Sequence, residues 1–394
     1  DDLIRTYCPE GVKRVRLEEV CKTNMGEFVR KDKQNPNGKY PVYNGGSTNT
    51  GYYDEYNTAA NKVIISARGA AGFVNYINVP FWAGNSCHVI SVLDKDDLLE
   101  KYLYYILKNQ EQDLINHQQK GGGVPAVSKK QIDSLLIPLP PLPIQQTIVS
   151  YLDKLTSLTA ELEAELELQK KRYDFYRNRL LSFAPDSATQ FDARLNSTTP
   201  VKWVKLGEIA EIIRGGNFQK KDFVESGYPC IHYGQIYTHY GTSATETITY
   251  VGEDVFCKSK KAQPNDIVMA VTSENIEDVC KCVAWIGKEP IAVSGHTAII
   301  HHQQNAKYLS YYFHTAMFAE QKKKLVHGTK VIEVTPKALE EILIPLPPLS
   351  EQERIVGILD KYETLVHNTQ EGIPALIAAV KQKYEYYRER MLTF

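Results

Sequence analysis

The stretch IQQTIVSYLDKLTSLTAELEAELELQKKRYDFYRNRLLSF, residues 144–183, decides the fold. It contains no internal glycine or proline, and it is rich in leucine, glutamate, alanine, lysine and arginine, which favour helices. Its apolar positions form two series at spacing seven, offset by three residues, which is the a and d pattern of a coiled coil. The series are Leu152, Thr159, Leu166, Tyr173 and Leu180, and Leu155, Leu162, Gln169, Tyr176 and Phe183. The sequence predicts one long helix whose seam needs a partner.

A second copy of this element supplies that partner. The hexapeptide IPLPPL occurs at residues 137–142 and again at 344–349, and a helix start of the form Gln-x-x-Ile-Val-x-x-Leu-Asp-Lys follows each copy. We therefore predict two similar helices paired antiparallel about a pseudo-twofold axis. Four residues are added to the second helix around Gly372 and Pro374, and they should kink or break it. The alternative is two unrelated amphipathic helices, each packed on its own domain.

The segments ahead of the helices also repeat, because VKRVRLEEV at residues 12–20 matches VKWVKLGEI at residues 201–209. We expect an α+β protein: two similar mixed α/β domains joined by two long helices that form an antiparallel coiled coil. The first domain should contain short strands and one amphipathic helix over residues 101–116. The expected bounds are a first domain at 1–143, a helix at 144–183, a linker at 184–200, a second domain at 201–350 and a second helix at 351–394.

Composition narrows the class of protein. With 46 basic and 47 acidic side chains the net charge is −1, so any nucleic-acid-binding surface must be local. No apolar run reaches the roughly 18 residues of a membrane span, and seven irregularly spaced cysteines fit a reducing cytoplasm. Cys230, Cys257, Cys280 and Cys282 suggest zinc as an alternative, but no CxxC pair is present, which favours buried thiols and no metal site.

Catalytic motifs are missing from the sequence. There is no P-loop, no GxGxxG after a strand and no amino-methyltransferase Pro-Pro-aromatic element. The pattern predicts a chain that binds and does not catalyse. Two other readings stay open: a DNA-modifying enzyme with an unrecognised site, and a scaffold that uses the coiled coil to join proteins.

The doubled IPLPPL-to-helix element and the tyrosine-rich helix ends resemble the specificity subunits of type I restriction–modification systems. The resemblance implies that each domain is a target recognition domain that reads half of a split double-stranded DNA site, and that the helices set the spacing. It also implies two modification (methyltransferase) subunits and two restriction subunits as partners, with S-adenosylmethionine, ATP and magnesium bound by those partners. No catalytic residue or cofactor is then expected in this chain.

Framework positions repeat between the halves while the loops differ, which is typical of a duplicated module that reads two targets. Polar and basic loop side chains suit base readout in the major groove, and two tyrosines could pack on sugars or bases. The candidates are Tyr43, Asn44, Asn49, Arg68, Asn85 and Lys120 in the first domain, and His232, Tyr233, Gln235, Thr272, Ser273, His296 and Lys330 in the second. Each could instead be a solvated loop residue or a turn former. Phe175 and Tyr386 lie off the seam and are the candidates for docking the modification subunits.

Overall fold

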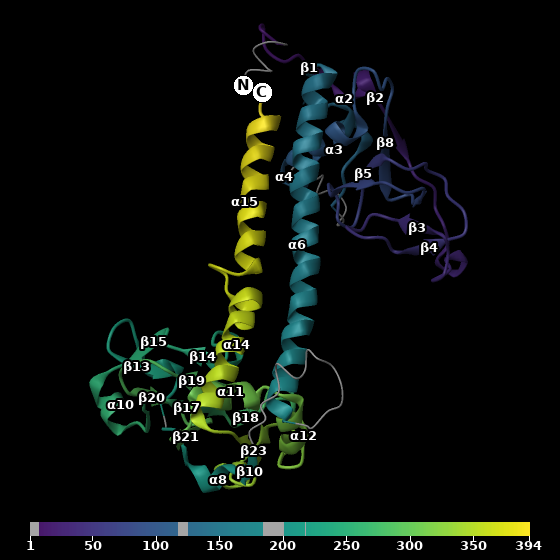
Figure 1. Cartoon of the computed structure of the whole chain (residues 1–394). Helices are drawn as coiled ribbons and strands as arrows, with labels where there is room; N and C mark the ends of the chain where they lie inside the picture. Colours follow the sequence, from purple (N-terminus) through teal and green to yellow (C-terminus); the bar gives the residue numbers. More distant parts are fainter. Residues whose placement is uncertain (1–7, 117–124, 184–200, 217) are drawn as a thin grey trace. The chain divides into compact units, whose positions relative to one another are not determined.

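The computed structural model describes residues 8–116, 125–183, 201–216 and 218–394 (Figure 1). The chain divides into two compact units. Unit 1 comprises residues 1–163 and 376–394, and unit 2 comprises residues 164–375. Each unit therefore combines one mixed α/β domain with segments taken from both long helical regions. The predicted linker, residues 184–200, lies outside the described residues.

Unit 1 is built on an antiparallel sheet. Its elements ahead of the long helix are β1 (Arg14–Arg16), α2 (Leu17–Val20), β2 (Cys21–Met25), η1 (Lys31–Lys33), β3 (Tyr40–Tyr43), β4 (Gly51–Tyr53), β5 (Lys62–Ser66), β6 (Val74–Ile77), β7 (Trp82–Ala83), β8 (Cys87–Val92), α3 (Glu100–Asn109), α4 (Glu111–Asn116), α5 (Lys129–Asp133) and β9 (Leu136–Pro138). The main sheet has the order β2-β8-β5-β6, and β4-β3-β7 and β1-β9 form smaller sheets. Helix α3 packs on β5 and β6, and its buried Tyr102, Leu103 and Ile106 belong to the core.

The prediction of a single helix over residues 101–116 is wrong, because the structure has α3 and α4 with a break at Gln110. The backbone of Gln110 leaves the helical conformation, with φ −91° and ψ 1°. Its side-chain amide donates to the carbonyl of Leu136 at 3.1 Å. That contact is tertiary, so the local sequence does not reveal it.

Unit 2 repeats this plan with additional strands. Its elements between the long helical regions are β10 (Lys202–Lys205), α8 (Leu206–Ile209), β11 (Ala210–Arg214), η2 (Lys220–Asp222), β12 (Phe223–Val224), β13 (Tyr228–Ile231), α9 (Tyr233–Thr238), β14 (Ser243–Ala244), β15 (Thr249–Val251), α10 (Glu253–Lys258), β16 (Lys261–Ala262), β17 (Asp266–Ala270), β18 (Thr272–Ser273), β19 (Cys282–Trp285), β20 (Ile291–Val293), β21 (Thr297–His302), α11 (Ala306–Phe313), α12 (Ala316–Lys323), β22 (Ile332–Glu333), α13 (Pro336–Leu339) and β23 (Leu343–Leu346). One sheet has the order β11-β21-β17-β19-β14, and a second has the order β12-β15-β13-β20-β16. The antiparallel run β11-β21-β17 corresponds to β2-β8-β5 of unit 1.

The first long helix, α6 (Leu142–Ser182), is continuous over 41 residues. It begins two residues earlier than predicted, because Pro143 sits in the first turn, where its missing N–H costs nothing. Every predicted a and d position from Leu152 to Phe183 is buried or half-buried. The off-seam Leu158 and Leu168 are exposed, so the heptad prediction for α6 is confirmed.

The second helical region is broken where the inserted residues fall. Helix α14 (Leu349–His367) ends at Asn368, and α15 (Ile373–Leu392) begins after a turn. The side-chain oxygen of Asn368 accepts hydrogen bonds from the backbone N–H groups of Gln370 and Glu371. A Cβ atom at Gly372 would lie only 2.3 Å from the carbonyl oxygen of Thr364, so the turn requires glycine there. The predicted break is confirmed.

Helix pairing is antiparallel within each unit. In unit 1 the rings of Tyr151 and Tyr387 are 4.7 Å apart, and Lys381 pairs with Glu163 at 2.7 Å. As the residue number rises along α6, the number of the residue that it contacts falls, which is the antiparallel order. The contacts in unit 2 follow the same order. There the rings of Tyr173 and His367 are 5.7 Å apart, and those of Tyr176 and Tyr362 are 5.4 Å apart.

A buried glutamine fixes each domain to the start of its own helix. The Gln145 side chain accepts from the backbone N–H of Leu99 and donates to the carbonyls of Asp97 and Pro140. In unit 2, Gln352 accepts from the N–H of Asn305 at 3.0 Å and donates to the Gln304 side chain and the Pro347 carbonyl. Both glutamines are fully buried. We call this arrangement the glutamine anchor.

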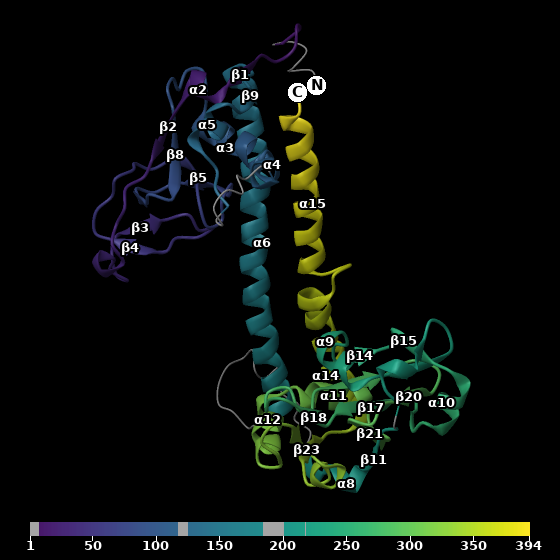
Figure 2. The same ribbon diagram turned by 180° about the vertical axis from the view of Figure 1, so that it is seen from behind.

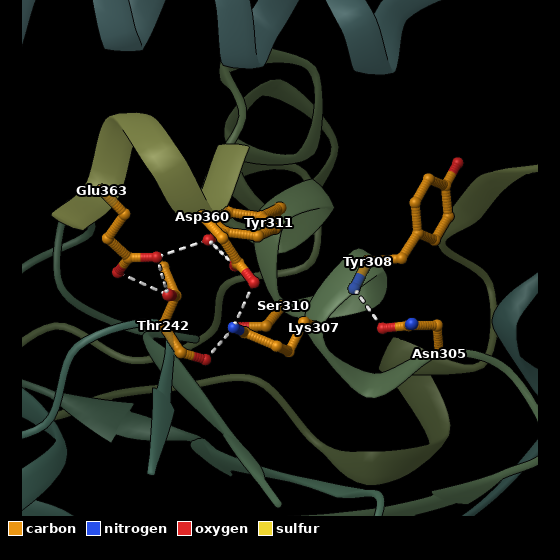
Figure 3. Close-up of polar contacts among 8 residues, drawn as sticks. All are labelled: Thr242, Asn305, Lys307, Tyr308, Ser310, Tyr311, Asp360 and Glu363. Atoms are coloured by element: carbon orange, nitrogen blue, oxygen red, sulfur yellow. Dashed lines mark hydrogen bonds and ion pairs between the residues drawn. The ribbon is translucent and has the colours of Figure 1, made fainter. Parts of the chain in front are cut away.

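An ion-pair network joins α11 to α14 in unit 2 (Figure 3). Lys307 pairs with Asp360 at 2.6 Å, and the Tyr311 hydroxyl lies within 2.6 Å of both Asp360 and Glu363. The Thr242 hydroxyl also donates to Glu363. Burial, reinforced by the Glu363 and Asp360 carboxylates, raises the pKa of Tyr311 far above its ordinary value, so the hydroxyl stays protonated as the donor.

The same contact recurs in unit 1, where α3 lies beside α6 in both views (Figures 1 and 2). Lys101 pairs with Asp153 at 2.7 Å, and the Tyr105 hydroxyl donates to Asp153 at 2.5 Å. The duplication therefore includes the side chains that mount each domain on its helix. None of the described helices is long and apolar enough to cross a membrane.

Replacing Gln352 by alanine should destabilise unit 2 by about 1–2 kcal/mol, because the part-buried N–H of Asn305 loses its acceptor. Hydrogen exchange of the Asn305 amide should accelerate, and urea unfolding should report the loss of free energy. The matched variant Gln145→Ala should instead affect the Leu99 amide in unit 1. Unchanged exchange at Asn305 in the Gln352→Ala variant would contradict the anchoring role.

Candidate functional site

Three loops of unit 1 meet at one edge of its sheets: residues 43–49, 66–70 and 84–86. The side-chain oxygen of Asn44 accepts from the backbone N–H of Ser86 at 3.3 Å. The N–H of Ala70 donates to the carbonyl of Gly45 at 2.9 Å, and the N–H of Ala67 donates to the carbonyl of Ser86 at 2.8 Å. We call this surface the unit 1 loop edge.

The unit 1 loop edge brings together most of the side chains predicted to read DNA in the first domain. Arg68 and Asn85 are exposed and extend from two of its loops. Tyr43 is half-buried and packs edge-on against Phe81, and Asn49 donates to the carbonyl of Gly51. Lys120 lies outside the described residues.

Four segments of unit 2 form the corresponding unit 2 loop edge: residues 231–235, 271–275, 294–296 and 327–333. The N–H of Tyr233 donates to the Ser294 hydroxyl at 2.9 Å. The Thr272 hydroxyl lies 3.0 Å from Nδ1 of His296, and the rings of Tyr233 and His296 are 4.9 Å apart. The structure therefore gathers Tyr233, Thr272 and His296 on one surface.

The two loop edges share a backbone framework. The Ala67-to-Ser86 hydrogen bond of unit 1 corresponds to the bond from Val271 to His296 in unit 2, at 3.0 Å. Two further pairs of bonds correspond in the same way: Gly84 to Tyr43 with Ser294 to Ile231, and Val127 to Ala67 with Val334 to Val271. The framework repeats, whereas the side chains that it presents differ.

A cavity of about 380 Å³ opens on the unit 2 loop edge. It is lined by four predicted residues, Tyr233, Thr272, Ser273 and His296, and by Tyr237, Glu274, Asn275, Asp278 and Val331, which the sequence analysis missed. The polar run Ser273-Glu274-Asn275 is a local signal that could have pointed to the polar residues, whereas the sequence holds no such signal for Val331. Aromatic, polar and carboxylate groups therefore line the same cavity.

His232 and Gln235 hold the loops in place from below the surface. His232 is buried, and its Nδ1 atom accepts from the N–H of Gly234 at the start of α9. The Gln235 side-chain oxygen accepts from the N–H of His232, and its amide donates to the Thr249 hydroxyl. Both side chains make internal contacts, and the buried Thr272 shares this supporting position.

Lys330 is exposed on a short hairpin over residues 327–333. The hairpin is closed by two backbone hydrogen bonds between His327 and Glu333, and its second strand, β22, pairs with β18. The Arg214 guanidinium pairs with Glu333 and donates to the carbonyl of Gly295. These contacts tie the hairpin to the 294–296 loop and hold Lys330 at the rim of the edge.

Three titratable groups at the unit 2 edge have shifted pKa values, and for Tyr237 burial raises the pKa. Burial lowers the pKa of His232, and the nearby Lys220 and His296 lower it further, so the imidazole is neutral and can accept from Gly234. Hydrogen bonds from Lys281 and Asn275 lower the pKa of Asp278, which keeps its carboxylate ionised.

The cysteines do not assemble a metal centre in the part of the chain that the structure describes. Cys230, Cys280 and Cys282 are buried free thiols and Cys257 is exposed. Burial raises the pKa of Cys280 and Cys282 to about 12, which makes them poor metal ligands. Among the described residues, no three His, Cys, Asp or Glu side chains converge as a metal site would require.

The helical regions present exposed aromatic side chains and a groove. Phe175 is 62% exposed and Tyr386 is 52% exposed, whereas the seam residue Tyr173 is buried. In unit 1 a groove of about 840 Å³ runs between α3, α6 and α15, with Tyr104 and Tyr384 in its lining. In unit 2 a smaller groove of about 320 Å³ is lined by the corresponding residues of α11 and α14, Lys307, Asp360, Glu363, Thr364 and His367.

Comparison with known proteins identifies the class. The family model of the type I restriction modification DNA specificity domain matches twice, over residues 9–169 and 200–379. The EcoR124I/EcoR124II specificity subunit of Escherichia coli is 30% identical over 378 residues, covering 91% of this chain and 83% of that protein. The fold resembles a type I S subunit from M. genitalium, with a TM-score of 0.62, 17% identity, and coverage of 97% of this chain and 96% of that one.

A chain from a structure concerned with complex assembly and conformational transition of the type I R-M system also matches, with a TM-score of 0.59 and 20% identity over 98% of both chains. Two DNA specificity domains with paired helices define a sequence-recognition protein. The chain belongs to the specificity subunits of type I restriction–modification systems, which are non-catalytic, and the predicted family and fold class are confirmed.

The free energy of unfolding of unit 2 should fall as pH drops below about 6.5, the ordinary pKa of histidine. The unfolded chain then binds a proton at His232, whereas the folded state resists it because its pKa is lowered. His232→Asn keeps an N-cap acceptor for α9 and should reduce this slope. Burial also lowers the pKa of His302, His314 and His367, and these residues should keep the remainder of the slope. His239→Asn, at the exposed end of α9, is the matched control and should keep the wild-type slope. Identical slopes in all three proteins would contradict the assignment.

Proposed function

We propose that this chain directs a type I restriction–modification complex to a bipartite site in double-stranded DNA. In this proposal the unit 1 loop edge reads one half-site and the unit 2 loop edge reads the other. The observation that carries it is the shared backbone framework of the two edges, which presents different side chains in each unit. A common framework with divergent loops lets one docking geometry read two base sequences.

Side chains at the edges supply the base contacts in this proposal. Arg68, Asn85, Tyr43 and the loop with Asn44 and Asn49 serve unit 1, and Lys120, which lies outside the described residues, remains a candidate from the sequence. Tyr233, Ser273, His296 and Lys330 serve unit 2, supported by His232, Gln235 and Thr272. Arginine suits guanine and asparagine suits adenine in the major groove. The proposed domain bounds remain 1–143 and 201–350, with helical regions at 144–183 and 351–394.

Partner subunits supply what this chain lacks. Its net charge of −1 provides little bulk attraction to phosphates, so tight binding needs phosphate contacts from elsewhere. We assign those contacts to two modification subunits that dock on the helical regions near Phe175 and Tyr386, where exposed aromatics favour an interface. Two restriction subunits would join for cleavage. S-adenosylmethionine, ATP and magnesium would bind to these partners in the cytoplasm.

Lys330→Ala should weaken DNA binding by the assembled complex and lower the salt dependence of the logarithm of the binding constant by about one unit. Fluorescence anisotropy with the complex at several salt concentrations measures both. Lys205→Ala removes an exposed lysine on the separate β10–β23 pair and serves as the matched control. Equal affinity of wild type and Lys330→Ala at low and high salt would remove Lys330 from the interface.

The helical pair would act as a ruler between the half-sites. Deleting the heptad 159–165 from α6 and the seven residues opposite it in α15 should shorten the rod by about 10 Å. At about 3.4 Å per base pair this removes roughly three base pairs from the gap. Methylome sequencing of cells that carry the variant and its modification subunit reads the gap directly. Methylation at the original spacing would refute the ruler.

A further inference from the structure

The cavity on the unit 2 loop edge has an apolar wall that the fold leaves uncovered. Val331 lines the cavity and is 61% exposed, although the adjacent Ile332 is buried. The 327–333 hairpin that carries Val331 is held by the β18–β22 pairing and by Arg214. Its methyl groups are therefore carried by a held backbone and remain largely exposed toward the cavity.

The cavity also contains a carboxylate that remains available. Glu274 directly follows β18, lines the cavity and is exposed. It makes no ion pair or side-chain hydrogen bond with any residue that the structure describes. The other acid of the cavity, Asp278, is occupied by Lys281 and Asn275. Glu274 is therefore a carboxylate acceptor in this cavity that is available to take a hydrogen bond from a ligand.

An exposed valine and a free carboxylate, Val331 and Glu274, together favour one kind of base pair. In the major groove, thymine presents a C5-methyl group and adenine presents an N6 amino donor, whereas guanine presents only acceptors and cytosine lacks the methyl. A valine favours the methyl, and a carboxylate favours an amino donor and repels the guanine acceptors. An A·T pair offers both features, and a G·C pair offers a donor without a methyl.

We infer that the unit 2 cavity reads an A·T pair, with Val331 against the thymine methyl and Glu274 accepting from the adenine N6 amino group. This inference rests on the proposed DNA-reading function of the unit 2 loop edge. Thr272, Ser273 and His296 line the same cavity and add further polar groups to it. Val331 and Glu274 thereby become specificity-determining residues.

The test uses the chain assembled with its modification subunit and the bipartite site found by methylome sequencing. The unit 2 half-site is the one whose hydroxyl-radical footprint Lys330→Ala weakens. Two base analogues remove one group each. Deoxyuridine for thymidine removes only the methyl, and 2-aminopurine for adenine moves the amino group into the minor groove while keeping the pair with thymine.

At one A·T pair of this half-site, replacing thymidine by deoxyuridine should weaken binding by the wild type roughly three- to fivefold. Val331→Ala should bind the thymidine and deoxyuridine sites equally well. At the same pair, 2-aminopurine should weaken binding roughly tenfold for the wild type and not for Glu274→Ala. Glu274→Gln keeps a carbonyl acceptor and should retain discrimination between adenine and 2-aminopurine. Neither alanine variant should alter discrimination in the unit 1 half-site or shift the unfolding midpoint, because both side chains are exposed.

A unit 2 half-site without any A·T pair would overturn the inference. The inference would also be overturned if Val331→Ala and Glu274→Ala discriminated against deoxyuridine and 2-aminopurine as strongly as the wild type does. Specific binding to a bipartite site in that case would leave the proposed function standing. A wild-type complex that shows no bipartite site would instead defeat the proposed function itself.

Discussion

A buried glutamine amide at the start of each long helix fixes the position of the adjoining domain. Gln145 and Gln352 each satisfy a loop N–H and the carbonyl of a proline in the segment that leads into the helix. In a buried position an unpaired donor or acceptor costs about 1–3 kcal/mol, so the bonding pattern tolerates few alternatives. Each glutamine thereby ties the domain and the start of its helix together through several hydrogen bonds at once.

The anchor explains why the loops could diverge without loss of the fold. The tyrosine, lysine and aspartate that join α3 to α6 recur in the contact of α11 with α14. Unit 2 adds Glu363 at the place where unit 1 has Thr156, whose hydroxyl donates to its own helix. The mounting is thus conserved within the chain in its essential bonds, and the side chains of the loop edges are free to specify different partners.

Much of the architecture follows from the sequence because it is encoded by period and repetition. The heptad from Leu152 to Phe183 predicts α6, and the inserted Gly372 and Pro374 predict the break between α14 and α15, since both depend on local chemistry. At the break, Gln110 bonds to Leu136, which is distant in sequence. A helical pattern alone therefore fails at that position.

The loop edges were predictable as regions but less so as individual side chains. His232 and Gln235 have the residue types of base readers, yet they pair with Gly234 and Thr249 beneath the surface. Val331 looks unremarkable in the sequence, and only the pairing of β18 with β22 places it beside Glu274 in one cavity. Tertiary contacts decide which loop residues face outward.

The distribution of the core residues also bears on how readily each unit folds. Leu392 is buried in the same core of unit 1 as Leu152. The core of unit 2 includes Leu180 and Leu181 of α6, and unit 2 ends at residue 375. Unit 2 is one continuous stretch of chain, whereas unit 1 joins residues 1–163 to residues 376–394. Closing unit 1 therefore requires contacts at much greater sequence separation, and this slower closure leaves its core exposed longer to aggregation and proteolysis.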